Sequence, residues 1–179
     1  MTATAEAVPI TRKTHTVVLR LSVAIAVVLC VWLGAVVYFV AVVAPAAFRA
    51  LPSRALAGAL VGQTLPAIFV SGIVAGVLVF GLALRGGRAM PWRGARLLGG
   101  MIVALLCGVA QFVIGSRIDR LLAAMVGGPD ALPASDPQRI AFGRLHALSV
   151  ASLGLAALVA VVILAVTLAS IGRQAARGE

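Results

Sequence analysis

The residues of this 179-residue sequence that could do chemistry are the few polar side chains that lie within, or directly beside, long apolar runs. The candidates for a polar or transport site are Gln111, Arg117, Arg144, His146 and Ser149. Gln111 shares a helical face with small residues, so we expect its amide to point towards neighbouring helices. Two interpretations stay open: Gln111 is a ligand for a substrate or ion, or it makes an interhelical hydrogen bond worth roughly 0.6–2 kcal/mol.

His146 opens the last apolar run, two residues after Arg144. An imidazole at this position could relay protons, bind a metal or meet an anionic head group, or it could simply cap the helix or reach the membrane surface. Arg117, Asp119 and Arg120 cluster where the third apolar run ends. They predict an interfacial anchor with a local ion pair, or alternatively an anion site shared with Arg144 and His146.

Enzymatic and metal chemistry have little support in this sequence. Cys30 and Cys107 are its only cysteines, and each lies near the middle of an apolar run. Two thiols at one depth could bind a soft metal or exchange with each other, although a buried cysteine is commonly a small apolar residue. The sequence has no paired acids, P-loop, G-x-S-x-G or H-E-x-x-H motif. We therefore expect a non-enzyme without a metal or cofactor.

The composition predicts which element positions these side chains. Hydrophobic residues make up 62% of the sequence, charged residues make up 11%, and the mean hydropathy is +1.13. A soluble domain averages about 45–50% apolar and about 25% charged residues. The composition therefore favours transmembrane segments and excludes a disordered chain, a disulfide scaffold and a soluble enzyme.

Four apolar runs are long enough to cross a bilayer core of about 30 Å as helices. We predict an all-α bundle of four transmembrane helices, because strand-like alternation is absent and lipid is spanned only by helices or closed barrels. The second run is longer than one span needs, and we expect Pro66 to interrupt it, which makes residues 55–64 an amphipathic lead-in near the interface. The predicted spans are residues 21–43, 65–84, 97–114 and 145–171, which together form a membrane domain over residues 21–171, between a basic tail of residues 1–20 and a second tail of residues 172–179.

Lysine and arginine predict the orientation, because cytoplasmic loops of membrane proteins are enriched in both. The two tails and the link between spans two and three carry nine of the 15 cationic side chains, and the other side carries six. We therefore expect both termini in the cytoplasm and a multi-pass protein of the cell membrane, with the bacterial inner membrane favoured. The formal charge of +10 is spread along the chain, which argues against nucleic acid and leaves the lipid bilayer as the expected partner.

Small residues at four-residue spacing predict close helix packing, because lipid gives no hydrophobic drive for helix association. Such pairs are Gly58 with Gly62 and Gly72 with Gly76 in the second run. The third and fourth runs carry the stripes Gly100, Ala104, Gly108 and Ser152, Ala156, Ala160. These stripes fit a monomeric bundle and a homo-oligomer equally well.

Two motifs resemble a known family. The end of the first span reads Trp32-Leu33-Gly34-Ala35 and then Ala44-Pro45-Ala46-Ala47-Phe48, and the start of the fourth reads Phe142-Gly143-Arg144-Leu145-His146-Ala147-Leu148-Ser149. On these motifs, with Trp32, Gly34, Pro45 and Phe48 as marker residues, the chain resembles the transmembrane-protein-205-like family, domain of unknown function 4149 (DUF4149). The resemblance covers about residues 21–168. It implies a small four-helix integral membrane protein whose bacterial relatives have no established activity.

Two functions are compatible with these patterns. The first is a non-enzymatic membrane bundle with an accessory or interaction role. The second is a small oligomeric transporter or channel for an ion or small molecule, with Gln111 and His146 in its pathway. Because four helices are few for a transporter, the second function requires at least a dimer.

Overall fold

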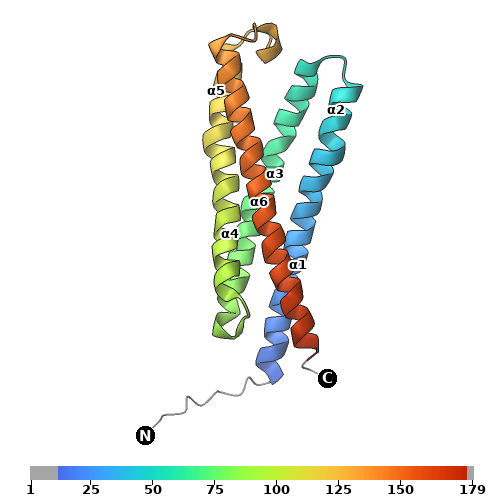
Figure 1. Ribbon diagram of the computed structural model, residues 1–179, viewed down its shortest axis with the longest axis vertical. Coiled ribbons are helices and arrows are strands. Elements are labelled where there is room, and N and C mark those ends of the chain that lie inside the picture. The colour runs from blue at the N-terminus through green and yellow to red at the C-terminus, as the bar shows by residue number, and fades with distance from the viewer. Residues whose placement is uncertain (1–11, 177–179) are drawn as a thin grey trace.

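The computed structural model describes residues 12–176, and every regular element in this part of the chain is helical. Four long helical rods lie side by side, and the start of α1 and the end of α6 lie at the same end of the bundle (Figure 1). In the first and third rods a π-helical segment, η1 or η3, separates two α-helices. In chain order the elements are α1 Arg12–Tyr38, η1 Phe39–Val43, α2 Ala44–Ala50, α3 Arg54–Arg85, η2 Gly87–Ala89, α4 Arg93–Gly108, η3 Val109–Gly115, α5 Ser116–Ala124, η4 Pro129–Ala131 and α6 Pro137–Ala175.

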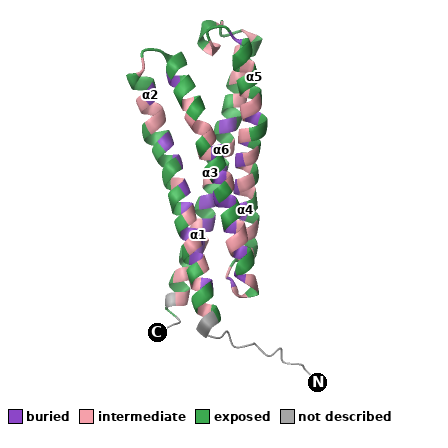
Figure 2. Cartoon of the chain, turned by 180° about the vertical axis from the view of Figure 1, so that it is seen from behind, coloured by how far each residue is buried: buried purple, intermediate pink, exposed green. Residues whose placement is uncertain are grey.

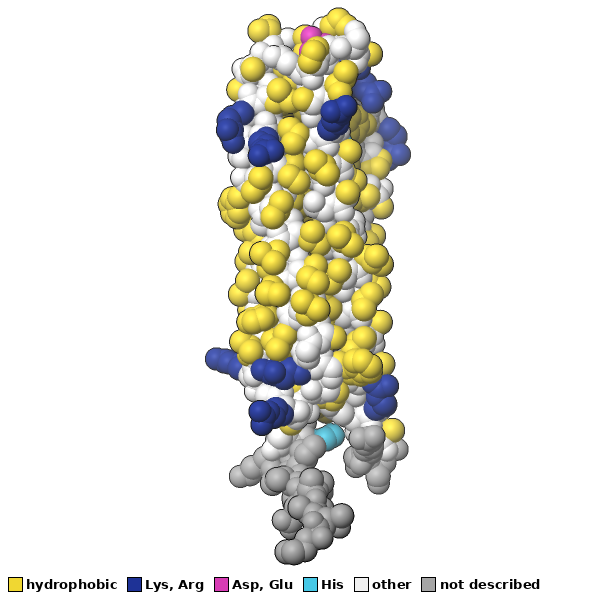
Figure 3. Space-filling model, turned by 60° about the vertical axis from the view of Figure 1, so that its left-hand side comes forward, with side chains coloured by type: hydrophobic (Ala, Val, Ile, Leu, Met, Phe, Trp, Pro, Cys, Tyr) yellow, Lys and Arg dark blue, Asp and Glu magenta, His cyan; other side chains and the backbone are white. Residues whose placement is uncertain are grey.

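All four rods are long and apolar enough to cross a membrane, which confirms the predicted four-helix class. Figure 3 shows two belts of Lys and Arg side chains with an apolar band between them. Arg20 and Arg49 are 29 positions apart in the sequence, as are Arg144 and Arg173, which corresponds to about 44 Å of helix. A bilayer with its head-group layers is about 40–45 Å thick. The two belts therefore fit the two head-group layers of one membrane.

The helices extend beyond the predicted spans at both chain ends. α1 begins at Arg12, inside the segment predicted as a tail of residues 1–20, and α6 continues to Ala175. Residues 1–11 and 177–179, which make up the rest of the predicted tails, lie outside the described residues.

α3 runs without a break through Pro66, so the predicted interruption is wrong. A proline inside a helix removes one backbone donor, and transmembrane helices tolerate this loss where nearby groups satisfy the freed carbonyls. The carbonyl that Pro66 leaves without its helical donor is that of Gly62, whereas the nearby Thr64 hydroxyl donates to the carbonyls of Leu60 and Val61, at 3.0 Å each. Residues 55–64 are therefore the first part of α3 and do not form a separate lead-in.

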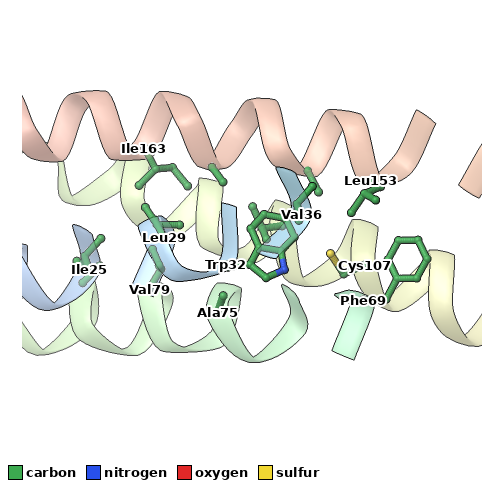
Figure 4. Close-up of a cluster of buried hydrophobic side chains, with 14 of the residues drawn as sticks. Ile25, Leu29, Trp32, Val36, Phe69, Ala75, Val79, Cys107, Leu153 and Ile163 are labelled. Atoms are coloured by element: carbon green, nitrogen blue, oxygen red, sulfur yellow. The ribbon is translucent and has the colours of Figure 1, made fainter. Parts of the chain in front are cut away.

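The hydrophobic core lies where α1, α3, α4 and α6 pack together. Its fully buried side chains include Ile25 and Leu29 from α1, Val79 from α3 and Val103 from α4, with Ile163 of α6 covering them (Figure 4). Farther from the chain ends the rods separate into two pairs, α2 with α3 and α5 with α6 (Figures 1 and 2). The half of the bundle next to the chain ends is therefore the more tightly packed half.

Glycines bring α3 and α4 into close contact. A Cβ on Gly76 would lie 2.5 Å from the carbonyl oxygen of Gly100, and a Cβ on Gly100 would lie 2.8 Å from the carbonyl oxygen of Gly76. Only glycine fits at both positions, because the obstacle on each side is backbone. Of the predicted small-residue positions, Gly76 and Gly100 therefore lie in the contact between α3 and α4, whereas Gly58, Gly62 and Gly108 face open space.

The loop between α5 and α6 is held by polar contacts. The Asp136 carboxylate accepts from the backbone N–H of Gln138 at 2.8 Å and caps α6. Arg139 donates to the carbonyl of Leu132 at 2.7 Å and pairs with Asp130 at 3.6 Å. This is the only ion pair within residues 12–176, so the local ion pair predicted around Asp119 is not formed.

Candidate functional site

Three of the predicted site residues occupy different environments. Gln111 lies in η3 and is half-buried, and its amide makes no hydrogen bond to any described residue. Ser149 is buried, with 3% of its surface exposed. His146 is exposed on α6 and stacks on Phe142, with ring centroids 6.0 Å apart. π-helical segments occur often at functional sites, which keeps Gln111 a candidate.

The other two predicted residues, Arg117 and Arg144, are exposed. Arg117 and Arg120 line a surface hollow of about 260 Å³ together with Leu121 and Ala124. The predicted anion site combined Arg117 with Arg144 and His146. Of these three, Arg117 alone lines this hollow.

The two cysteines have different surroundings and are both free thiols. Cys30 is exposed on α1, and Cys107 is fully buried on α4. A Cβ on Gly72 would lie 2.5 Å from the Cys107 sulfur, so Cys107 fills the space that this glycine leaves. Across residues 12–176, no three or more His, Cys, Asp or Glu side chains group together in a way that could hold a metal ion.

The marker residues of the first motif contribute mainly to packing. Trp32 is buried, and its indole Nε1 donates to the carbonyl of Ile68 at 3.2 Å, which ties α1 to α3. Gly34 faces open space, and Phe48 is about half exposed at 48%. Pro45 lies in the first turn of α2, directly after η1. Of the four, Trp32 is thus the residue that joins two helices.

A buried polar cluster around Arg96 lies near the chain ends of the bundle. The Arg96 side chain is fully buried and joins three helices. Its Nη1 donates to the Ser22 hydroxyl on α1 at 3.2 Å, and its Nη2 donates to the Ser170 hydroxyl on α6 at 2.6 Å. Ser170 in turn donates to the carbonyl of Thr167 at 2.7 Å.

The Arg96 cluster leaves polar groups unsatisfied. The Nε of Arg96 and the hydroxyl oxygen of Thr167 are buried and have no hydrogen-bond partner. No carboxylate in residues 12–176 forms an ion pair with Arg96. Burial of a charged group costs several kcal/mol unless an opposite charge compensates it. Two serine hydroxyls supply hydrogen bonds to Arg96, and they supply no negative charge.

A surface pocket of about 250 Å³ adjoins this cluster. Its walls are Pro91 and Trp92, which precede α4, and Ser170, Arg173 and Gln174 of α6. Ser170 belongs to both the pocket wall and the Arg96 cluster, so its hydroxyl links the pocket to the buried guanidinium. This arrangement can bind an anion by hydrogen bonds and charge.

The sequence predicted Arg96 to be one of several cations that set orientation, and its burial was missed. An arginine at the end of an apolar run looks the same in sequence whether it extends to the lipid surface or turns into the bundle. The available signal was the presence of hydroxyl residues, Ser22 and Ser170, at the same end of two other spans. That signal becomes specific only when the helix packing is known.

The fold defines the class first: this is a multi-pass membrane protein built from four spanning helices. Within that class, the chain belongs to the family described as "Domain of unknown function (DUF4149)", which matches residues 13–126. The match runs from α1 to the end of α5 and confirms the DUF4149 assignment. It does not test the transmembrane-protein-205-like label, and the motif at residues 142–150 lies outside it. Comparisons with curated proteins and with solved structures give no match.

Proposed function

We propose that the protein is a non-enzymatic bundle of the bacterial inner membrane that has an interaction role and associates with a second copy of itself. The observation that carries this proposal is the open glycine face of α3, formed by Gly58 and Gly62. Both glycines are exposed, and a Cβ at either would meet no other atom within 4 Å. The G-x-x-x-G spacing lets two transmembrane helices approach closely enough for backbone contact.

A second G-x-x-x-G pair in α3 is packed against another helix of the same chain. Gly72 and Gly76 repeat the G-x-x-x-G pattern farther along α3 and face Cys107 and Gly100 of α4. Gly58 and Gly62 lie on the arm of α2 and α3 that separates from α5 and α6. The open glycine face is therefore available to a helix from outside the chain.

The proposed orientation has both termini in the cytoplasm. It is supported by the nine cationic residues of the tails and the inner link, against six at the opposite end. In this orientation the open glycine face lies in the outer half of the membrane, and the Arg96 cluster lies in the inner half.

The association is tested by cross-linking and native mass measurement of the full-length chain in membranes and detergent. We expect a dimer for the wild type and a dissociation constant raised at least about tenfold in Gly58→Leu/Gly62→Leu, because two leucines block the close approach. Gly154→Leu is the matched control, since Gly154 of α6 is equally open but has Val150 and Leu158 at four-residue spacing. A strictly monomeric wild type, or equal dimerisation by all three proteins, would contradict the proposal.

The second candidate function is an oligomeric transporter or channel with Gln111 and His146 in the pathway. The position of half-buried Gln111 in a π-helical segment favours it. The two candidates separate in a liposome flux assay over ions and small amphiphiles. Flux that disappears in His146→Ala while the dimer persists would favour transport over the interaction role.

A further inference from the structure

Positive charge is concentrated without compensation at the end of the bundle that holds the Arg96 cluster. The described arginines there are Arg20, Arg85, Arg88, Arg93, Arg96 and Arg173. The three described carboxylates lie at the opposite end of the bundle: Asp119 in α5, and Asp130 and Asp136 in the loop between α5 and α6. The remaining acids, Glu6 and Glu179, lie outside the described residues. The described part of this end therefore carries cations and no acid.

The start of α4 makes this imbalance larger. The first turn of a helix carries free N–H groups and a partial positive charge, and it favours anions. α4 instead begins with Arg93 and has Arg96 one turn later, with no acid in its first turn and no side-chain cap. Two guanidinium groups at the positive end of a helix dipole are stabilised when an anion lies between them and the helix end.

The polar groups around the pocket are suited to an oxyanion. Arg173 is exposed at the pocket wall, and Gln174 and Ser170 can each present a hydrogen-bond donor there. Four buried polar atoms close to the pocket have no hydrogen-bond partner: the Nε atoms of Arg93 and Arg96, the hydroxyl oxygen of Thr167 and the side-chain oxygen of Gln174. Arginine binds phosphate oxygens through planar, charge-assisted hydrogen bonds.

We propose that the pocket between the start of α4 and the end of α6 binds a phosphate group. Arg173 contacts the phosphate oxygens, and the first turn of α4 and the buried Arg96, acting through Ser170, supply the positive field. The phosphate can belong to an anionic phospholipid, because the pocket lies at the arginine-rich end of the bundle, or it can be free inorganic phosphate. This site is independent of the glycine face proposed for association.

The test uses tryptophan fluorescence: of the two tryptophans, Trp92 lines the pocket and is 58% exposed, whereas Trp32 is buried in the core and is not a lining residue. Full-length protein in detergent is titrated with phosphatidylglycerol against phosphatidylcholine, and separately with sodium phosphate against sodium chloride at equal ionic strength. A saturable change with phosphatidylglycerol alone identifies a lipid phosphate, and a saturable change with phosphate identifies the free anion. Either result supports the site.

Variants decide whether the response comes from this pocket. We expect Arg173→Gln and Arg96→Gln to weaken binding about tenfold. Arg88→Gln, which removes an exposed charge at the same end but not from the pocket, should bind within about twofold of the wild type. Because Arg96 is buried and its variant can misfold, the exposed Arg173 keeps the test decisive.

Three results would overturn the proposal. The first is that neither probe changes the emission of Trp92. The second is that Arg173→Gln and Arg88→Gln respond alike, which would reduce the effect to general surface charge. The third is that Glu6→Gln/Glu179→Gln lowers the thermal stability as much as Arg96→Gln does, which would identify a carboxylate of the chain itself as the counter-charge.

Discussion

Ser170 is the residue on which the buried polar cluster depends. Its hydroxyl accepts from the Arg96 guanidinium at 2.6 Å and donates to the carbonyl of Thr167 at 2.7 Å. Ser22 is the second acceptor for Arg96, at the longer distance of 3.2 Å. The pair of hydroxyls thus supplies hydrogen bonds to an arginine that pairs with none of the described carboxylates.

At the residue scale we predict that Ser170→Ala lowers the free energy of unfolding by about 1–3 kcal/mol, because it leaves a buried charged donor without its closest acceptor. Gln111→Leu should change it by less than about 0.5 kcal/mol, since the Gln111 amide has no hydrogen bond to a described residue to lose. Unfolding of the purified protein in mixed detergent micelles measures both. Equal losses in the two variants would mean that the Arg96 cluster contributes no special stability.

These two residues also show the limit of sequence reasoning about sites. Gln111 was singled out because a polar side chain inside an apolar run is conspicuous, yet no described residue hydrogen-bonds it. Arg96 was grouped with the surface cations because the end of a run is where cations are expected. The packing of α1, α4 and α6 decides which of the cations at the ends of the apolar runs is buried, and no local sequence pattern encodes that packing.

At the scale of elements, direct contact between the two backbones determines how closely α3 and α4 approach each other. Gly76 and Gly100 face each other so closely that neither position leaves room for a methyl group. Along the same helix, Gly81 faces open space. Gly76 and Gly81 of α3 therefore differ in their surroundings, although the sequence around both is equally apolar.

We predict that Gly76→Ala destabilises the bundle by about 1–3 kcal/mol, because the added Cβ must push the α4 backbone away. Gly81→Ala should change stability by no more than about 0.5 kcal/mol. The same unfolding measurement in micelles compares them. If Gly76→Ala were as stable as Gly81→Ala, the close crossing of α3 and α4 would be wrong.

The elements themselves were largely predictable. Four uncharged runs of sufficient length can be satisfied in lipid only as helices, and all four are found. The prediction at Pro66 failed because a proline is a strong break signal in water, whereas a transmembrane helix tolerates the loss of one backbone hydrogen bond, and α3 continues through it. The π-helical segments η1 and η3 were not anticipated, since no simple residue pattern marks them.

At the scale of the whole molecule, the charged belts and the apolar band between them describe a protein that spans one bilayer four times. The proposed orientation has the Arg96 cluster and its pocket at the cytoplasmic head groups and the open glycine face of α3 towards the outer leaflet. The direction in which the bundle crosses the membrane thus decides which leaflet each proposed site faces.

Thiol labelling in intact cells tests this topology most directly. Arg88→Cys, in the link between α3 and α4, and Ala134→Cys, in the loop before α6, place exposed thiols at opposite ends, while native Cys30 and Cys107 lie within spans. With a membrane-impermeant reagent, we predict labelling of Ala134→Cys in intact spheroplasts, labelling of Arg88→Cys only after permeabilisation, and none of the wild type. Labelling of Arg88→Cys in intact spheroplasts, or of both variants together, would contradict a bundle with both termini in the cytoplasm.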